Sequence, residues 1–167
     1  GGFAPAVAFA AGAGPWKLTA GDLDGDGDID LAVARDARRI SILRNQGGSF
    51  AAPEMYTVLS GSSSDAYRQL DLSDVDRDGD LDVLVGNYTG NLLYFRNSGT
   101  AAAPAFAASS NNPFGFSDVG DQAMPALADL DGDGDRDAIV CNLAGQLIYF
   151  RNTGSAAAPA FLHQFES

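Results

Sequence analysis

The residues with the clearest chemistry are fifteen aspartates gathered in three windows of nine residues, 22–30, 74–82 and 129–137. Each window carries aspartate at its first, third, fifth, seventh and ninth positions. Calcium in proteins takes about six to eight oxygen ligands, which alternating carboxylates and backbone carbonyls of a tight loop can supply. The candidate metal ligands are therefore Asp22, Asp24, Asp26, Asp28, Asp30, Asp74, Asp76, Asp78, Asp80, Asp82, Asp129, Asp131, Asp133, Asp135 and Asp137.

Position within the loop predicts the role of each aspartate. In the first loop, the side chains at positions 1, 3 and 5 (Asp22, Asp24 and Asp26) can converge on one ion, and glycine at position 6 permits the sharp turn. We expect Asp30 at position 9 to complete the coordination from the far side. Asp28 at position 7 is expected to offer its backbone carbonyl. The other two loops repeat these roles.

The alternatives to calcium fit these loops less well. A helical EF-hand needs glutamate at position 12, where this chain has Val33, Val85 and Val140 in a strand-like pattern. Magnesium requires small octahedral geometry, and zinc or copper would call for histidine or cysteine ligands. Merely solvated turns would leave three aligned sets of five carboxylates repelling one another without a cation. The sequence therefore predicts three structural Ca²⁺ sites.

The loops belong to a repeat, because their first aspartates are 52 and 55 residues apart. Each loop is followed by two short apolar runs, an Arg-Asn-x-Gly turn at Arg44, Arg96 or Arg151, and a segment that contains proline. The runs are rich in Val, Ile, Leu, Tyr and Phe and are bounded by Gly, Asn or Asp, which indicates strands. The repeat therefore predicts about four strands per unit.

The strand after each loop is apolar on both faces, with Leu31 and Val33 on one face and Ala32 and Ala34 on the other. Both faces must be covered, as they are in neighbouring blades of a propeller. We therefore expect an all-β fold of β-propeller blades, each with about four antiparallel strands. Residues 1–167 are expected to form one propeller segment, with blades at about 14–59, 66–108 and 121–167 and a leading strand at 3–10.

The segments Pro125–Asp135, Gly145–Gly154 and Ala158–Phe161 carry a family resemblance that extends over nearly the whole chain. They resemble the FG-GAP/VCBS repeat family. That resemblance implies calcium-binding β-propellers related to the integrin α-chain head and to certain fungal lectins, found mainly on exported adhesion, carbohydrate-binding and some enzymatic proteins. This chain departs from the repeat at Arg77, which replaces a loop glycine, and at Arg136, which replaces an apolar residue.

Three blades are fewer than the about four to eight of a closed propeller. Either the chain is part of a longer propeller, which we favour, or neighbouring subunits complete the ring, since large apolar faces seldom stay exposed. Extracellular calcium modules bind at about 10⁻⁴ to 10⁻³ M, which implies an extracellular or cell-surface location. The partners expected are thus neighbouring blades or subunits, together with a glycan or protein ligand.

The two rims of the blades are expected to differ. The calcium loops share one rim with the Arg-Asn-x-Gly turns, whose arginines either pair with loop carboxylates or are solvated. The opposite rim carries the variable segments, where a ligand site is expected. The candidates for ligand binding are Trp16, Arg35, Arg38, Tyr67 and Tyr88. Their aromatic rings could stack on sugars, although packing is the commoner role near a blade junction.

The sequence favours a binding or adhesion module. An architectural subunit and the propeller domain of a polysaccharide-acting enzyme stay open as alternatives. Catalysis is disfavoured because His163 and Cys141, the only residues of their types, form no triad or thiol constellation. The net charge of −12 would repel phosphate backbones, so no nucleic-acid partner is expected. No apolar run approaches the about eighteen residues that cross a bilayer, so no membrane insertion is expected.

Overall fold

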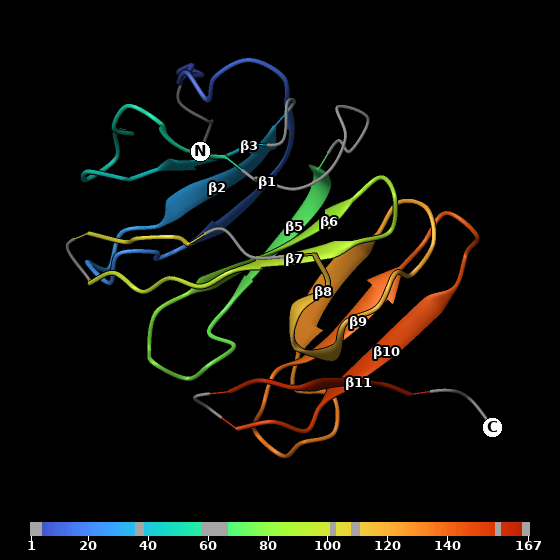
Figure 1. Cartoon of the computed structure of the whole chain (residues 1–167). Helices are drawn as coiled ribbons and strands as arrows, with labels where there is room; N and C mark the ends of the chain where they lie inside the picture. The colour runs from blue at the N-terminus through green and yellow to red at the C-terminus, as the bar shows by residue number, and fades with distance from the viewer. Residues whose placement is uncertain are drawn as a thin grey trace.

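The computed structural model of the chain consists of three antiparallel sheets that follow one another along the sequence (Figure 1). It describes residues 5–35, 39–57, 67–100, 103–107, 111–155 and 158–164, except for the side chains of Tyr67 and Arg68. The described part is all-β, apart from the short 3₁₀ turn η1 (Pro113–Gly115). No helix within it is long and apolar enough to span a membrane.

Each sheet is a meander in which strands that are consecutive in sequence pair with one another. Blade 1 contains β1 (Pro15–Gly21), β2 (Asp30–Arg35), β3 (Arg39–Leu43) and β4 (Glu54–Thr57). Blade 2 contains β5 (Tyr67–Ser73), β6 (Asp82–Asn87) and β7 (Leu92–Phe95). Blade 3 contains β8 (Met124–Ala128), β9 (Asp137–Cys141), β10 (Leu147–Asn152) and β11 (Phe161–Gln164). The predicted all-β, blade-like architecture is confirmed.

Two details differ from the expectation of four strands per unit and a leading strand. The fourth position of blade 2 holds only isolated bridges, from Asn97 to Phe106 and from Leu93 to Asn111, among the residues that the structure describes. Residues 5–10 are not part of a strand. This stretch is rich in alanine, which has low β-propensity, and its Phe9 packs edge-to-face on Phe50 of blade 1, with ring centroids 5.2 Å apart.

Apolar cores fill the spaces between the blades. The core between blades 1 and 2 contains Ala32, Ala34, Ile40, Ile42, Leu70, Val83, Val85, Leu93 and Phe95. The core between blades 2 and 3 contains Leu84, Leu92, Tyr94, Ala138, Val140, Phe150 and Phe161. Alternate residues of β6 enter different cores, because successive side chains of a strand point to opposite faces. Every residue of β6 is buried, as the two-sided apolar pattern predicts.

The first strands of the blades, β1, β5 and β8, lie next to one another along one edge of the stack. At this edge the backbone N–H of Leu127 donates to Oδ2 of Asp71 at 2.7 Å, which joins blade 3 to blade 2. Nearby, a Cβ on Gly86 would overlap the backbone carbonyl of Ala123. The blades are therefore held by a directional hydrogen bond and close backbone approach as well as by their apolar cores.

The outer faces of the two end blades carry exposed apolar side chains. Leu18 of blade 1 is 57% exposed, and Leu147 of blade 3 is 69% exposed. Leu18 pairs across the sheet with Val33, on the side of blade 1 that faces away from blade 2. Leu147 lies on the side of blade 3 that faces away from blade 2. Both ends of the stack thus expose apolar sheet faces, whereas the apolar faces between the blades are buried.

Candidate metal centre

Each aspartate loop connects the first and second strands of its blade and is wound around its own carboxylates. The position-1 aspartate accepts the backbone N–H of the position-6 glycine. These bonds join Gly27 to Asp22, Gly79 to Asp74 and Gly134 to Asp129 at 3.0, 3.1 and 3.0 Å. All three glycines have positive φ, which a residue without a side chain adopts at low cost. The amides at positions 5 and 7 donate to carboxylates two residues earlier.

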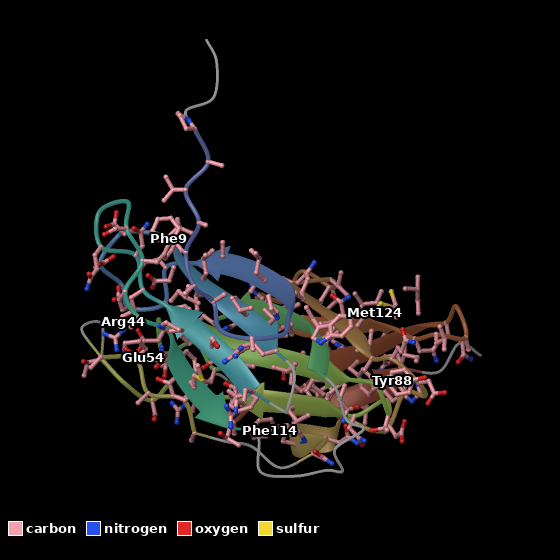
Figure 2. All side chains as sticks on the ribbon, turned by 90° about the horizontal axis from the view of Figure 1, so that it is seen from above. Phe9, Arg44, Glu54, Tyr88, Phe114 and Met124 are labelled. Atoms are coloured by element: carbon pink, nitrogen blue, oxygen red, sulfur yellow. The ribbon has the colours of Figure 1, made fainter. Side chains whose placement is uncertain are left out.

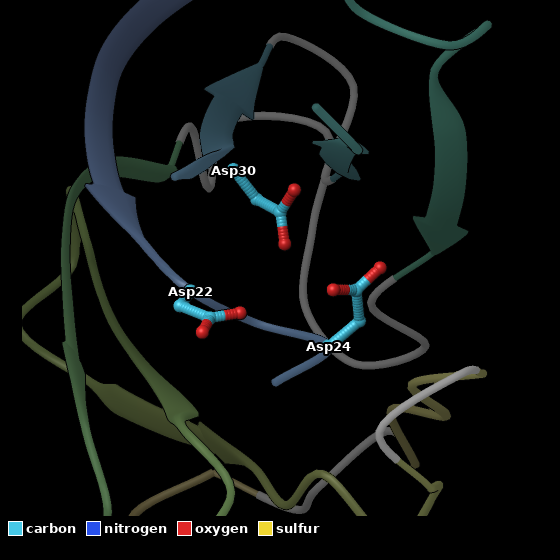
Figure 3. A group of neighbouring side chains, drawn as sticks. All are labelled: Asp22, Asp24 and Asp30. Carbon is cyan, nitrogen blue, oxygen red and sulfur yellow. The ribbon is translucent and has the colours of Figure 1, made fainter. Parts of the chain in front are cut away.

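Three carboxylates come together in every loop. In each group, one oxygen of each aspartate lies within 4.8 Å of the others. The groups are Asp22, Asp24 and Asp30 in loop 1, Asp74, Asp76 and Asp78 in loop 2, and Asp129, Asp131 and Asp133 in loop 3. Loops 2 and 3 thus gather positions 1, 3 and 5 as predicted, whereas loop 1 gathers position 9 in place of position 5. Figure 3 shows the three side chains of loop 1 around a common space.

The position-9 aspartate also ties its loop to the rest of the blade. Asp30 is fully buried and accepts the backbone N–H groups of Leu23 at 3.0 Å and Asn45 at 2.7 Å. Asp82 and Asp137 repeat this arrangement with Val75 and Asn97 and with Leu130 and Asn152. The second residue of each Arg-Asn-x-Gly turn therefore anchors the loop. Sequence reasoning missed this role, although the asparagine recurs in all three repeats.

Tyrosine hydroxyls hold the position-9 carboxylate in two of the blades. Tyr94 donates to Asp82 at 2.7 Å, and Tyr149 donates to Asp137 at 2.9 Å. Burial raises the pKa of Asp82 to about 6, although its hydrogen bonds act in the opposite direction. Burial and the bond to Asp137 raise the pKa of Tyr149 to about 12. The equivalent residue of blade 1 is Ile42, which has no hydroxyl to donate.

The arginines of the Arg-Asn-x-Gly turns lie on the same rim as the loops, as predicted. Arg96 pairs with Asp76 and, at 3.1 Å, with Asp78. Arg151 pairs with Asp131 at 2.6 Å and Asp133 at 3.5 Å, and the negative charge of Asp131 raises the pKa of its guanidinium. These contacts place a protein cation beside the carboxylates of loops 2 and 3.

Arg44 of blade 1 pairs with Glu54 at 2.6 Å, and Figure 2 shows the two side chains beside one another. Glu54 lies on β4, the outer strand of blade 1. The first repeat therefore gives its arginine a carboxylate from outside the aspartate loop.

The donor chemistry of the three groups fits a hard cation. All nine ligand atoms are carboxylate oxygens, with no histidine or cysteine among them. Burial and neighbouring carboxylates raise the pKa of Asp24 and of Asp76, which shows that negative charge is held there at a cost. In loop 2, Oδ1 of Asp74 is buried without a hydrogen-bond partner among the described residues. A bound cation would satisfy that oxygen and relieve the repulsion.

Contacts between blades also involve the loops. Arg77, which replaces the loop glycine in blade 2, has a φ of 57° and pairs with Asp135 of loop 3 at 2.6 Å. Nδ2 of Asn97 in blade 2 donates to the carbonyl of Leu23 in loop 1 at 3.2 Å. Neither contact was foreseen, because each joins residues of different repeats.

The ligand-binding candidates differ in exposure. Trp16 is 52% exposed and Tyr88 is 38% exposed. Arg35 is only 5% exposed, because its guanidinium donates to the carbonyl of Ala13 and to Oγ of Ser41. The guanidinium of Arg35 is thus buried and engaged by protein acceptors. Arg38 lies outside the described residues, and for Tyr67 only the backbone, in β5, is described.

Comparison with known proteins agrees with the repeat seen in the structure. A family model described as an FG-GAP-like repeat matches residues 22–85 and 74–140. Each match begins at the first aspartate of a loop and ends in the second strand of the following blade. A search of the curated proteins finds no match to this chain. Because the family matches span more than half of its length, this β-propeller-like chain belongs to the FG-GAP-like repeat family.

Proposed function

We propose that the chain is a calcium-binding β-propeller module of an extracellular or cell-surface protein, in which Ca²⁺ holds the three aspartate loops. The observation that carries this proposal is the recurrence of a three-carboxylate group in each of three blades. The buried, unpartnered Oδ1 of Asp74 supports it independently, because such an oxygen needs a donor or a cation. Calcium fits better than magnesium, because a flexible loop of carboxylates and carbonyls suits its larger and less regular coordination.

The role proposed for calcium is structural. Few of the ligand oxygens are positioned in the unfolded chain, so binding free energy appears as folding free energy. Each position-9 aspartate accepts backbone hydrogen bonds from its loop and from the Arg-Asn-x-Gly turn. An ion in the loop would therefore stabilise the rim of the blade as well as the loop.

Adhesion to a glycan or protein ligand is the activity that we propose for the module as a whole. The exposed aromatic side chains of Trp16 and Tyr88 support it, because aromatic faces stack on sugar rings and anchor protein interfaces. An architectural role is the second candidate, favoured by the exposed apolar faces around Leu18 and Leu147. In that role, further blades or subunits would cover these faces and complete a ring.

Thermal unfolding combined with the mass from size exclusion tests the calcium proposal. At a free-ion concentration about ten times the dissociation constant, each site adds about 1.4 kcal/mol of stability. A chain of this length gains about 2–4 °C in Tm for each kcal/mol. We expect Tm to rise with millimolar calcium relative to EGTA, and much less with magnesium. Equal Tm values in calcium and EGTA would refute the proposal, and the mass separates a single chain from a closed oligomer.

A pair of variants makes this test specific to the loops. Asp24→Asn removes a charge from the group in loop 1 and is expected to reduce the calcium-dependent rise in Tm. Asp121→Asn removes the same charge from an exposed residue outside the loops and should leave the rise unchanged. If both variants reduced it equally, calcium would be acting on net charge rather than at the loops.

A further inference from the structure

The three loops differ in the competition for their arginine. Arg96 and Arg151 each pair with the aspartates at positions 3 and 5 of their own loops. Arg44 pairs with Glu54. Glu54 lies opposite Ile42 in its sheet, and the residue opposite the equivalent Tyr149 of blade 3 is Gln164, which carries no charge. Blade 1 therefore contains a carboxylate outside the loop that shares the arginine, and the equivalent position of blade 3 holds a neutral side chain.

The loops differ also at position 9. Asp30 of loop 1 contributes an oxygen to its three-carboxylate group. Asp82 and Asp137 instead accept a tyrosine hydroxyl and are not members of the groups in loops 2 and 3. Both differences leave the carboxylates of loop 1 more available to a cation than those of loops 2 and 3. In loop 1 the position-9 carboxylate faces Ile42 instead of a tyrosine hydroxyl, and the arginine is shared with Glu54. In loops 2 and 3 a tyrosine hydroxyl holds the position-9 carboxylate, and the arginine pairs with the aspartates at positions 3 and 5.

Taking calcium binding at the loops as proposed above, we infer that the three sites fill in order, with loop 1 first. Arg96 and Arg151 act as internal cations that compete with calcium for loops 2 and 3. When Ca²⁺ enters, each guanidinium must either leave two carboxylates or remain beside a divalent ion of the same sign. Both arginines are about half exposed, so solvent and salt screen this competition. A difference of about fivefold in calcium affinity is expected from pairs of this kind.

The arrangement gives the module a graded response to calcium. Below the concentration that fills loops 2 and 3, Arg96 and Arg151 already reduce the repulsion between their carboxylates. Blade 1 would then be the first to hold an ion, while the other blades keep their rims closed by ion pairs.

Site-resolved NMR on the full chain tests the order. Gly27, Gly79 and Gly134 each donate a backbone N–H to the position-1 aspartate of their own loop, so each amide reports one site. With ¹⁵N-glycine labelling, the three signals are followed during a calcium titration. We expect Gly27 to reach its midpoint at about fivefold lower calcium than the other two. Equal midpoints, or Gly27 shifting last, would overturn the order.

Two substitutions test the competing carboxylate, by removing it from blade 1 and by adding it to blade 3. Glu54→Gln keeps the size of the side chain but releases Arg44 toward loop 1, and should raise the Gly27 midpoint severalfold. Gln164→Glu gives Arg151 the competing carboxylate at almost unchanged size and should lower the Gly134 midpoint, with Gln164→Ala as the uncharged control. Gln164 is exposed at the end of β11 and lines the same hollow as Arg151, Asp131 and Asp133, so these changes leave the fold intact, and the spectrum itself checks this.

The outcomes separate the inference from the function on which it rests. If Gln164→Glu raised the Gly134 midpoint, the arginine would be orienting carboxylates for the ion rather than competing with it, and the inference would be overturned. If no glycine signal shifted in millimolar calcium, calcium binding itself would fail, and the order with it. If the signals shifted together in every variant, calcium binding would stand and only the order would be lost.

Discussion

Replacing Tyr94 by phenylalanine removes one hydroxyl from the interior of blade 2 and leaves the ring in place. That hydroxyl donates to Asp82 at 2.7 Å, and the carboxylate is fully buried. The ring remains in the core between blades 2 and 3, so the apolar packing is unchanged. The substitution therefore isolates one hydrogen bond to a buried carboxylate.

The cost follows from the charge and burial of the acceptor. A hydrogen bond to a charged group contributes about 1.5–3 kcal/mol. The two backbone donors of Asp82, Val75 and Asn97, remain in Tyr94→Phe, so we expect a loss of about 2 kcal/mol. For a chain of this size that corresponds to a fall in Tm of about 4–8 °C. Tyr149→Phe should cost about half as much, because its hydroxyl lies 2.9 Å from Asp137 in a less buried setting.

Urea unfolding in EGTA at pH 7.5 measures both losses. At that pH the carboxylate of Asp82 is ionised, since its pKa is raised only to about 6. The comparison of the two variants is internal, because each removes the same group from an equivalent position. A loss below about 0.5 kcal/mol for Tyr94→Phe, or a larger loss for Tyr149→Phe, would refute the assignment of these bonds as stabilising contacts of the loop.

Three further predictions concern other parts of the stack. Gly86→Ala would drive a Cβ into the carbonyl of Ala123, so the free energy of unfolding should fall by about 2 kcal/mol or more. The control is Gly47→Ala, whose Cβ meets open space; its φ of 68° should lower the free energy of unfolding by only about 1 kcal/mol. Arg77→Gly relieves a φ of 57° but loses the ion pair with Asp135. In EGTA with 1 M NaCl the salt screens that ion pair, so the substitution should stabilise the chain by about 0.5–1 kcal/mol. Destabilisation in that salt would contradict this prediction. Because burial raises the pKa of Asp82 from 3.8 to about 6, its contribution to stability is full below pH 3.8 and is lost as pH rises through about 6 in EGTA. Asp82→Asn should lack this fall of up to about 3 kcal/mol between pH 4 and 7, and a fall of equal size in wild type and variant would assign it to other groups.

The blade architecture could be predicted from local pattern alone. A strand with apolar residues on both faces has to be covered twice, and β6 is covered by the cores on its two sides. The winding of the aspartate loops could be predicted in the same way, because glycine at position 6 specifies the turn and the alternating carboxylates come together within it. These features depend on residues that are close in the sequence, and the same pattern recurs in all three repeats.

The parts that escaped prediction depend on residues from different segments. The pairing of Arg44 with Glu54 joins the ends of β3 and β4 and, within the part of the chain that the structure describes, occurs in one repeat only. Arg35 was named as a candidate for ligand binding, and its guanidinium reaches Ala13, 22 residues earlier, and is buried there. A charged residue at a strand end gives no local sign of which partner the tertiary structure will bring to it.

The bonds between blades also determine how the module would carry a mechanical load. An apolar core alone allows neighbouring sheets to slide, because its contacts have no fixed direction. Here sliding of blade 3 against blade 2 would have to break the bond from Leu127 to Asp71 at one edge and the pair of Arg77 with Asp135 at the loop rim. Blades 1 and 2 are pinned at the loop rim by Asn97 and the carbonyl of Leu23. A chain pulled along its length would therefore resist shear at these polar points, and the aspartate rim would bear much of the tension.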